Sequence, residues 1–186
     1  MNPSAHLIFS ATAFGRPGKG ILVAALLGGL TPDLSLFLMA GVSLFILNIE
    51  PARVFGELYY SDAWQFVFSI DNSFPIWGTV LGIALYFRHQ ILTAFASASL
   101  LHLTTDFLLH NDDARVQFWP LSDWVFRSPL SYWDVRYGAL WVAPVLAAIS
   151  LGFTVLLWRR HKNWRLRLLW VLLMGIEAMI LFGHSV

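Results

Sequence analysis

The chain contains no cysteine among its 186 residues. Disulfide bonds, thiol catalysis and thiolate metal ligands are therefore excluded. Any metal bound by this protein must be held by imidazole nitrogen or by oxygen.

Charged residues are also scarce. They make up 12% of the chain, against about a quarter in soluble proteins. Hydrophobic residues make up 58%, and the mean hydropathy is +0.65. We therefore expect a single integral membrane domain over residues 1–186. The net charge of +1 and the lack of a basic patch argue against a nucleic-acid partner.

Two further features are missing. The first residues, from Met1 to His6, lack the basic region of a signal peptide, so we treat them as mature sequence. No internal repeat is visible, which argues mildly against a transporter built from inverted repeats.

The apolar runs predict an all-α fold, a polytopic membrane helical bundle with about five spanning helices. Each run is near the roughly 20 residues that a spanning helix needs. They cover residues 21–49, 69–87, 90–110, 137–158 and 168–182. A short N-terminal helix is expected over 4–14 and interfacial helices over 50–71, where aromatic residues are mixed with charges.

A long loop over residues 111–136 is rich in Trp, Asp, Ser and Pro. Loops of this length are often functional lids, and the alternative is an aromatic belt resting on the bilayer. Short basic loops mark the cytoplasmic side. Arg16, Lys19, Arg88 and the basic run 159–167 define that side, which makes the aromatic loop non-cytoplasmic. We expect a bacterial-type inner (plasma) membrane location.

A polar stripe ends the run 90–110. His102, Asp106 and His110 are four residues apart, so on a helix they lie on one face. Ionisable groups at membrane depth are costly and usually functional, which favours metal or proton chemistry. The alternative is a set of hydrogen bonds to neighbouring helices or to headgroup water.

A second polar position interrupts the run 21–49 at Thr31, Pro32 and Asp33. Proline breaks a helix, and a broken helix at membrane depth must face protein or a watery cavity. Asp33 is thus expected to face a site, to cap the helix that starts at Leu34, or both. His6, on the short N-terminal helix, is either a ligand or a structural residue.

Counting the rise per residue from the basic side places several of these groups at a similar depth, in the outer half of the membrane. They are His6, Asp33, Asn72, His102 and Asp106. Scattered structural polar residues would not be expected to share a layer. Glu177 and His184 are further candidates for a ligand or a proton relay.

Three motifs in this order resemble the YdjM-like family of inner-membrane, metal-dependent hydrolases. They are His6 in a Ser-Ala-His-Leu context, the segment Gly28-Gly29-Leu30-Thr31-Pro32-Asp33, and the His-x-x-x-Asp pair His102 and Asp106. The family usually has a His-x-x-x-x-His-Ser segment where this chain has Asp71-Asn72-Ser73. Asp71 is a substitute oxygen ligand in this interpretation, and Asn72 orients a water.

The resemblance implies a hydrolase that holds one or two divalent metals, with zinc suited to imidazole and carboxylate ligands. Asp112 or Asp113 would act as the base, and a lipid or lipid-linked phosphoester would be the substrate. The expected ligands are His6, Asp33, Asp71, Asn72, His102, Asp106 and His110.

Two other functions stay open. One is a non-catalytic accessory or assembly subunit of a larger membrane protein complex, which nine Trp and fifteen Phe would help to pack. The other is a metal or proton transport protein, with Asp33, Glu177 and the histidine stripe as the pathway.

Overall fold

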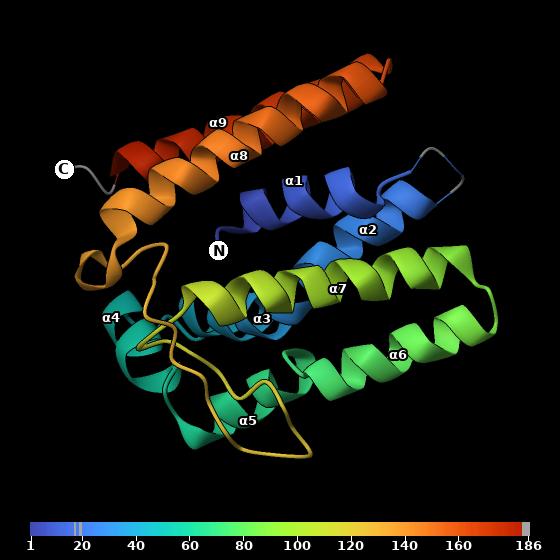
Figure 1. Ribbon diagram of the computed structural model, residues 1–186. Coiled ribbons are helices and arrows are strands. Elements are labelled where there is room, and N and C mark those ends of the chain that lie inside the picture. The colour runs from blue at the N-terminus through green and yellow to red at the C-terminus, as the bar shows by residue number, and fades with distance from the viewer. Residues whose placement is uncertain (17, 19, 184–186) are drawn as a thin grey trace.

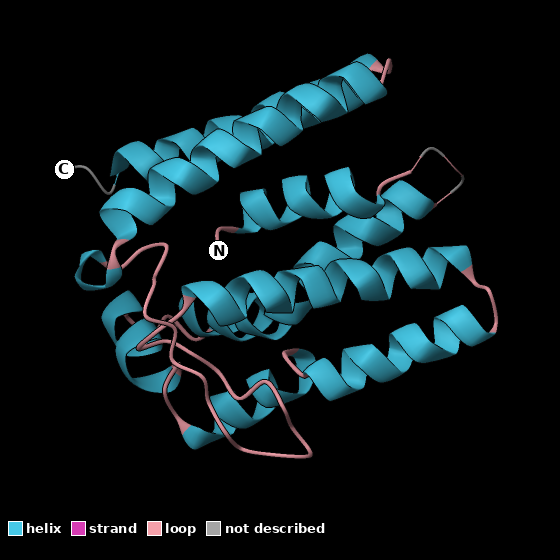
Figure 2. Ribbon diagram, viewed as in Figure 1, coloured by secondary structure: helices cyan, strands magenta, loops and turns pink. Residues whose placement is uncertain are grey.

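The computed structural model describes residues 1–16, 18 and 20–183. Helices and loops make up the whole of this described part, with no strand (Figure 2), which confirms the all-α prediction. The helices are α1 (Pro3–Phe14), α2 (Ile21–Leu30), α3 (Leu34–Gly41), α4 (Pro51–Arg53), α5 (Asp62–Asp71), α6 (Phe74–Tyr86), α7 (Gln90–Leu109), α8 (Ala139–Arg160) and α9 (Trp164–Gly183). Short 3-10 turns cover Thr31–Asp33 and Val135–Tyr137, and π-helical turns cover Val42–Ile46 and Val54–Leu58.

Three helical segments within the described residues are long and apolar enough to cross a membrane. They are Ile21–Ile46 with 26 residues, Gln90–Leu109 with 20 and Ala139–Arg160 with 22. Helix α6 has 13 residues, which is about 20 Å at 1.5 Å per residue and short of a hydrocarbon core of about 30 Å. Helix α9 is 20 residues long and carries two arginines and Glu177.

The short helix α1 lies in the middle of the bundle. The α8–α9 hairpin packs on one side of it, and α2 and α7 pack on the other, with α6 beyond α7 (Figure 1). Ile8 and Ala11 of α1 meet Leu157, Trp170 and Leu173 in a buried core. A helix enclosed by neighbours can be apolar on all sides, which explains why a segment too short to span is so hydrophobic.

Two glycines let α2 approach its neighbours closely. A Cβ atom on Gly28 would lie 2.1 Å from the carbonyl oxygen of Phe95 on α7, and one on Gly29 would lie 2.5 Å from Ser10 Oγ on α1. Small residues permit such close helix contacts inside membranes. Ser99 Oγ of α7 donates a hydrogen bond of 3.0 Å to the carbonyl of Gly28.

The helix break forms at Pro32, as predicted, and turns Asp33 inward. Asp33 makes no capping hydrogen bond to α3. Asp71, at the end of α5, accepts instead from the backbone N–H of Ser35 at 3.3 Å. Because another residue caps α3, the Asp33 carboxylate is free to face the interior.

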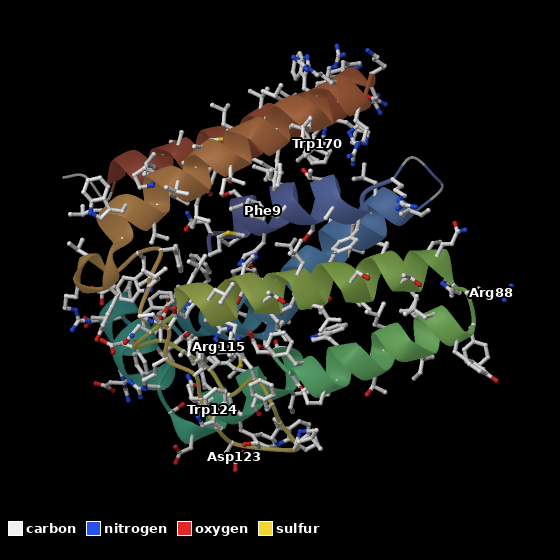
Figure 3. The ribbon with its side chains drawn as sticks, in the orientation of Figure 1. Phe9, Arg88, Arg115, Asp123, Trp124 and Trp170 are labelled. Carbon is white, nitrogen blue, oxygen red and sulfur yellow. The ribbon has the colours of Figure 1, made fainter. Side chains whose placement is uncertain are left out.

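The long loop folds back over the end of α7. The carbonyls of Leu108, Leu109 and His110 accept hydrogen bonds from Ser128 and Tyr132 of the loop. An aromatic cluster then holds the loop on the helix, with Phe107 stacked on Phe126 at 4.5 Å and Trp124 beside both. Arg88 lies at one end of the bundle, and Asp123 and Trp124 lie at the other (Figure 3).

Candidate metal centre

Four buried ionisable residues converge inside the bundle. His6 comes from α1, Asp33 from the turn after α2, and His102 and Asp106 from successive turns of α7. One ligand atom from each lies within 4.8 Å of those of the others, and no residue of the four is more than 7% exposed. The convergence of these four groups from three separate segments is as predicted. No comparable group of three or more occurs elsewhere among the described residues.

The two imidazole rings are stacked, with centroids 3.6 Å apart and planes 8° apart. His6 Nε2 is 3.0 Å from Asp106 Oδ1, and His102 Nε2 is 3.1 Å from Asp106 Oδ2. Neither contact has the geometry of a hydrogen bond, so both buried Nε2 atoms lack a hydrogen-bond partner. Asp33 Oδ2 is 3.7 Å from His102 Nε2. The four side chains point at a common centre.

The other ring nitrogens are held by the protein. His102 Nδ1 lies 2.8 Å from the carbonyl oxygen of Gly29, which only accepts, so this nitrogen carries the proton. His6 Nδ1 lies 3.4 Å from Thr105 Oγ1, and that hydroxyl is within hydrogen-bond reach of the His102 carbonyl at 2.8 Å. With its hydrogen on a carbonyl, the hydroxyl accepts from His6 Nδ1. Both Nε2 atoms then present lone pairs to the centre.

This arrangement fits a metal ion. Two neutral imidazoles and two carboxylates form a donor set that suits zinc or a similar divalent cation. The backbone carbonyl and the hydroxyl behind the rings are the outer contacts that metal-binding histidines normally have. A metal would also satisfy the Nε2 atoms, which would otherwise be buried polar groups without a partner.

Arg115 of the long loop lies outside the group of four and contacts one member of it, Asp33. It is 8% exposed and donates to Asp33 Oδ1 at 3.0 Å and Asn72 Oδ1 at 3.2 Å. Its guanidinium also lies 4.7 Å from the ring centre of Phe68. Burial disfavours its charge, but Tyr59 and Asp33 outweigh burial and raise the pKa of Arg115 above its ordinary value. Sequence reasoning assigned this residue no role at the site. The loop 111–136 holds seven charged residues, so the sequence offered no signal that distinguished Arg115 from the others.

Asp71 and Asn72, expected as substitute ligands, lie outside the group of four. Asp71 caps α3 and accepts from the Asn72 side chain at 3.0 Å. The Asn72 amide also donates to the Pro32 carbonyl at 2.9 Å. Asn72 therefore fixes both the helix break and Arg115, which are the two features that hold Asp33.

Three other residues expected at the site, His110, Asp113 and Asp112, lie at different places relative to the group of four. His110 Nε2 is 3.4 Å from Asp106 Oδ1, at the edge of the group, and the Met1 amino group contacts both residues. Asp113 Oδ2 accepts from His110 Nδ1 at 2.7 Å and from Trp133 Nε1 at 2.9 Å. These hydrogen bonds outweigh burial and lower the pKa of Asp113. Asp112 instead forms an exposed ion pair with Arg136 at 2.7 Å.

A cavity of about 370 Å³ opens onto this centre. Asp33, Asp106, His110, Asp113 and Arg115 supply its polar lining. The rest is largely apolar or aromatic and comes from the N-terminus, α3, the 54–60 segment and the long loop, with Met1, Pro3, Leu36, Phe37, Phe55, Tyr59, Tyr60, Tyr132 and Trp133. The long loop thus contributes directly to the candidate site.

Glu177, the other candidate ligand, lies elsewhere. It accepts from Ser4 Oγ at 2.7 Å and from the Asn2 amide at 3.2 Å, which ties α9 to the start of α1. His184 lies outside the described residues.

Comparison with protein-family models, with curated proteins and with solved structures found no match. The resemblance to the YdjM-like family therefore rests on the three motifs alone.

Proposed function

We propose that the protein is a membrane-embedded, metal-dependent hydrolase that acts on a lipid or lipid-linked phosphoester. The observation that carries this proposal is the pair of buried imidazole Nε2 atoms, without hydrogen-bond partners, that face two carboxylates beside a cavity. In this proposal α9 is a further spanning helix, and α6, which is too short to cross alone, is the fifth apolar segment of the bundle. The centre faces the non-cytoplasmic side of an inner membrane.

His6, Asp33, His102 and Asp106 would hold the metal, with His110 at the edge. When bound, a divalent metal such as zinc would lower the pKa of a water to about 7 and polarise the phosphoryl oxygen. The chain's own residues set the geometry. Arg115 keeps Asp33 in place, while Gly29 and Thr105 orient the two rings.

Asp113 is better placed than Asp112 to accept a proton. It lines the cavity, and its Oδ1 atom is buried without a hydrogen-bond partner, while Oδ2 is held by His110 and Trp133. Asp112 is outside the cavity lining and bound to Arg136.

The cavity supports an amphiphilic substrate. Arg115 supplies a fixed positive charge beside the centre, which suits a phosphoester. The apolar wall includes Phe37, which is 41% exposed on α3, so the cavity borders a surface that a membrane would cover. A lipid tail could therefore lie along α3 while its phosphoester reaches the centre.

The test uses the full chain purified in detergent without chelators. We expect metal in elemental analysis, and hydrolysis of phosphatidic acid or a polyprenyl diphosphate that EDTA abolishes and zinc restores. His102→Ala should lose both metal and activity. Asp113→Asn should keep the metal and lose about 100-fold or more in rate, whereas Asp112→Asn, its neighbour, should keep both.

Full hydrolysis by metal-free protein would refute the proposal. A metal-free, inactive chain whose deletion disrupts a larger complex would favour the accessory subunit. Metal uptake into liposomes without hydrolysis would favour a transport protein.

A further inference from the structure

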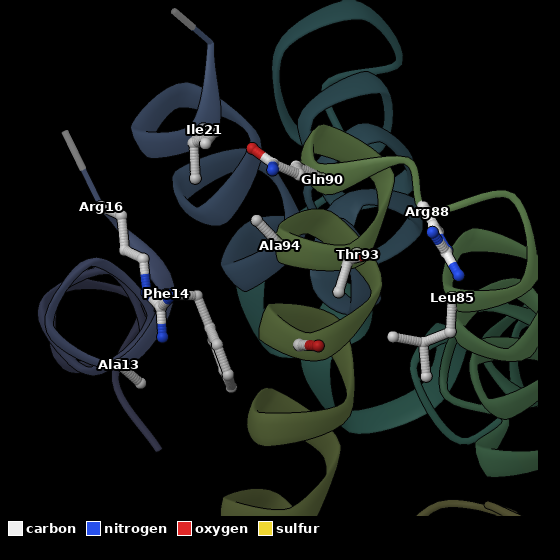
Figure 4. A pocket seen from close by; sticks show the side chains of 10 residues that line it. Ala13, Phe14, Arg16, Ile21, Leu85, Arg88, Gln90, Thr93 and Ala94 are labelled. Atoms are coloured by element: carbon white, nitrogen blue, oxygen red, sulfur yellow. The ribbon is translucent and has the colours of Figure 1, made fainter. Parts of the chain in front are cut away.

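A second, larger cavity lies at the other end of the bundle from the metal centre. Its volume is about 560 Å³, and it lies among the ends of α1, α2, α6 and α7 (Figure 4). Its lining residues are Ala13, Phe14, Arg16, Ile21, Leu85, Arg88, Gln90, Thr93, Ala94 and Ser97. It shares no residue with the cavity at the metal centre.

Two arginines give this cavity its charge. Arg16 lies on one side and Arg88 on the other (Figure 4). Within the described part of the chain, neither guanidinium forms an ion pair or a side-chain hydrogen bond, and no carboxylate lines the cavity. The uncharged polar groups of Gln90, Thr93 and Ser97 come from the first turns of α7. The positive end of that helix dipole adds to the attraction for an anion.

The backbone holds Arg88 in a costly conformation. Its φ is +52°, a region where glycine is the usual residue. The tight α6–α7 turn closes around it through a hydrogen bond of 2.8 Å from the His89 N–H to the Ala84 carbonyl. The turn thus fixes the backbone from which this side chain reaches the rim of the cavity.

Apolar side chains lie beside each arginine in the lining of the cavity. Phe14 and Ile21 are on the side of Arg16, and Leu85, which is 57% exposed, is on the side of Arg88 (Figure 4). An anion that carries hydrocarbon chains would match both the arginines and these apolar side chains. A free phosphate would use only the arginines.

We propose that this cavity binds the headgroup of an anionic phospholipid from the leaflet at the basic end of the bundle. The phosphate lies between Arg16 and Arg88, and the two acyl chains contact Phe14 and Ile21 on one side and Leu85 on the other. Phosphatidylcholine fits less well, because its choline cation would lie among arginines with no carboxylate to receive it. This inference does not depend on the proposed hydrolase activity.

Native mass spectrometry of the full chain in detergent tests the proposal. Dioleoyl-phosphatidylglycerol and dioleoyl-phosphatidylcholine are titrated in parallel. We expect phosphatidylglycerol to bind more tightly, and Arg16→Gln with Arg88→Gln to weaken it about tenfold or more, as expected for the loss of charge-assisted hydrogen bonds. The matched control is Arg159→Gln with Arg165→Gln, two exposed arginines at the same end that do not line the cavity.

Equal binding of the two lipids, or equal weakening by both double variants, would overturn the proposal, since general surface charge would then explain the result. Full competition by inorganic phosphate would indicate a free anion site instead. Leu85→Trp keeps both arginines and enlarges the apolar side chain beside Arg88, so it should weaken the binding of phosphatidylglycerol without affecting the binding of phosphate. Unchanged lipid binding by Leu85→Trp would contradict the proposed acyl-chain position.

Discussion

At His102, the two ring nitrogens have different roles. Nδ1 is fixed by the Gly29 carbonyl, and Nε2 faces the carboxylates without a hydrogen-bond partner. His6 repeats this arrangement with Thr105 behind it. The identity of the outer partner therefore decides which nitrogen is free to bind a metal.

Thr105→Val tests this dependence. Removing the hydroxyl leaves His6 Nδ1 without its partner, and losses of outer contacts typically weaken metal binding about 10- to 100-fold. Thr104→Val is the matched control, because Thr104 is exposed and its hydroxyl bonds only the Leu100 carbonyl. Zinc affinity is measured by competition with a chromophoric chelator. Unchanged affinity in Thr105→Val would mean that this hydroxyl does not orient the ring.

At the scale of the helices, close packing between α1, α2 and α7 assembles the centre. Gly28 meets the backbone of Phe95, and Gly29 meets Ser10, so α2 lies close enough for its carbonyl to reach His102. The break at Pro32 then directs Asp33 toward the same point. Helix contacts thus set the ligand geometry.

Gly28→Ala should separate α2 from α7. Its Cβ would lie 2.1 Å from a backbone oxygen, which cannot rotate away. Overpacking of this kind typically costs about 1–3 kcal/mol, and we expect a lower melting temperature and reduced metal content. Gly82→Ala is the control, since a Cβ at that position meets nothing within 4 Å. Thermal unfolding followed by circular dichroism makes the comparison, and equal melting of the two variants would argue against tight α2–α7 packing.

At the scale of the whole molecule, the two ends differ in charge and in the segments that form them. Arg16, Arg88 and the α8–α9 turn lie at one end, and the long aromatic loop lies at the other (Figures 1 and 3). The metal centre is nearer the loop, which contributes Arg115. From the positive-inside rule we expect the loop to lie outside the cytoplasm.

Labelling of single cysteines tests this orientation, and the natural chain provides a clean background because it has none. Asp123→Cys lies in the exposed loop, and Lys162→Cys lies in the exposed α8–α9 turn. A membrane-impermeant maleimide should label the first in intact cells and the second only after permeabilisation. The reverse pattern would place the metal centre toward the cytoplasm.

The sequence by itself determined the all-helical class, the apolar segments and the break at Pro32. It also determined a list of expected ligands that includes the four residues that converge. These features follow from composition, helical periodicity and the cost of ionisable groups in an apolar setting. Only the tertiary structure decided that Asp71 caps a helix, that Asn72 holds Arg115, and that Asp113 rather than Asp112 lines the cavity. Those roles depend on the folding of a long loop without periodicity, where contacts between distant residues place each side chain.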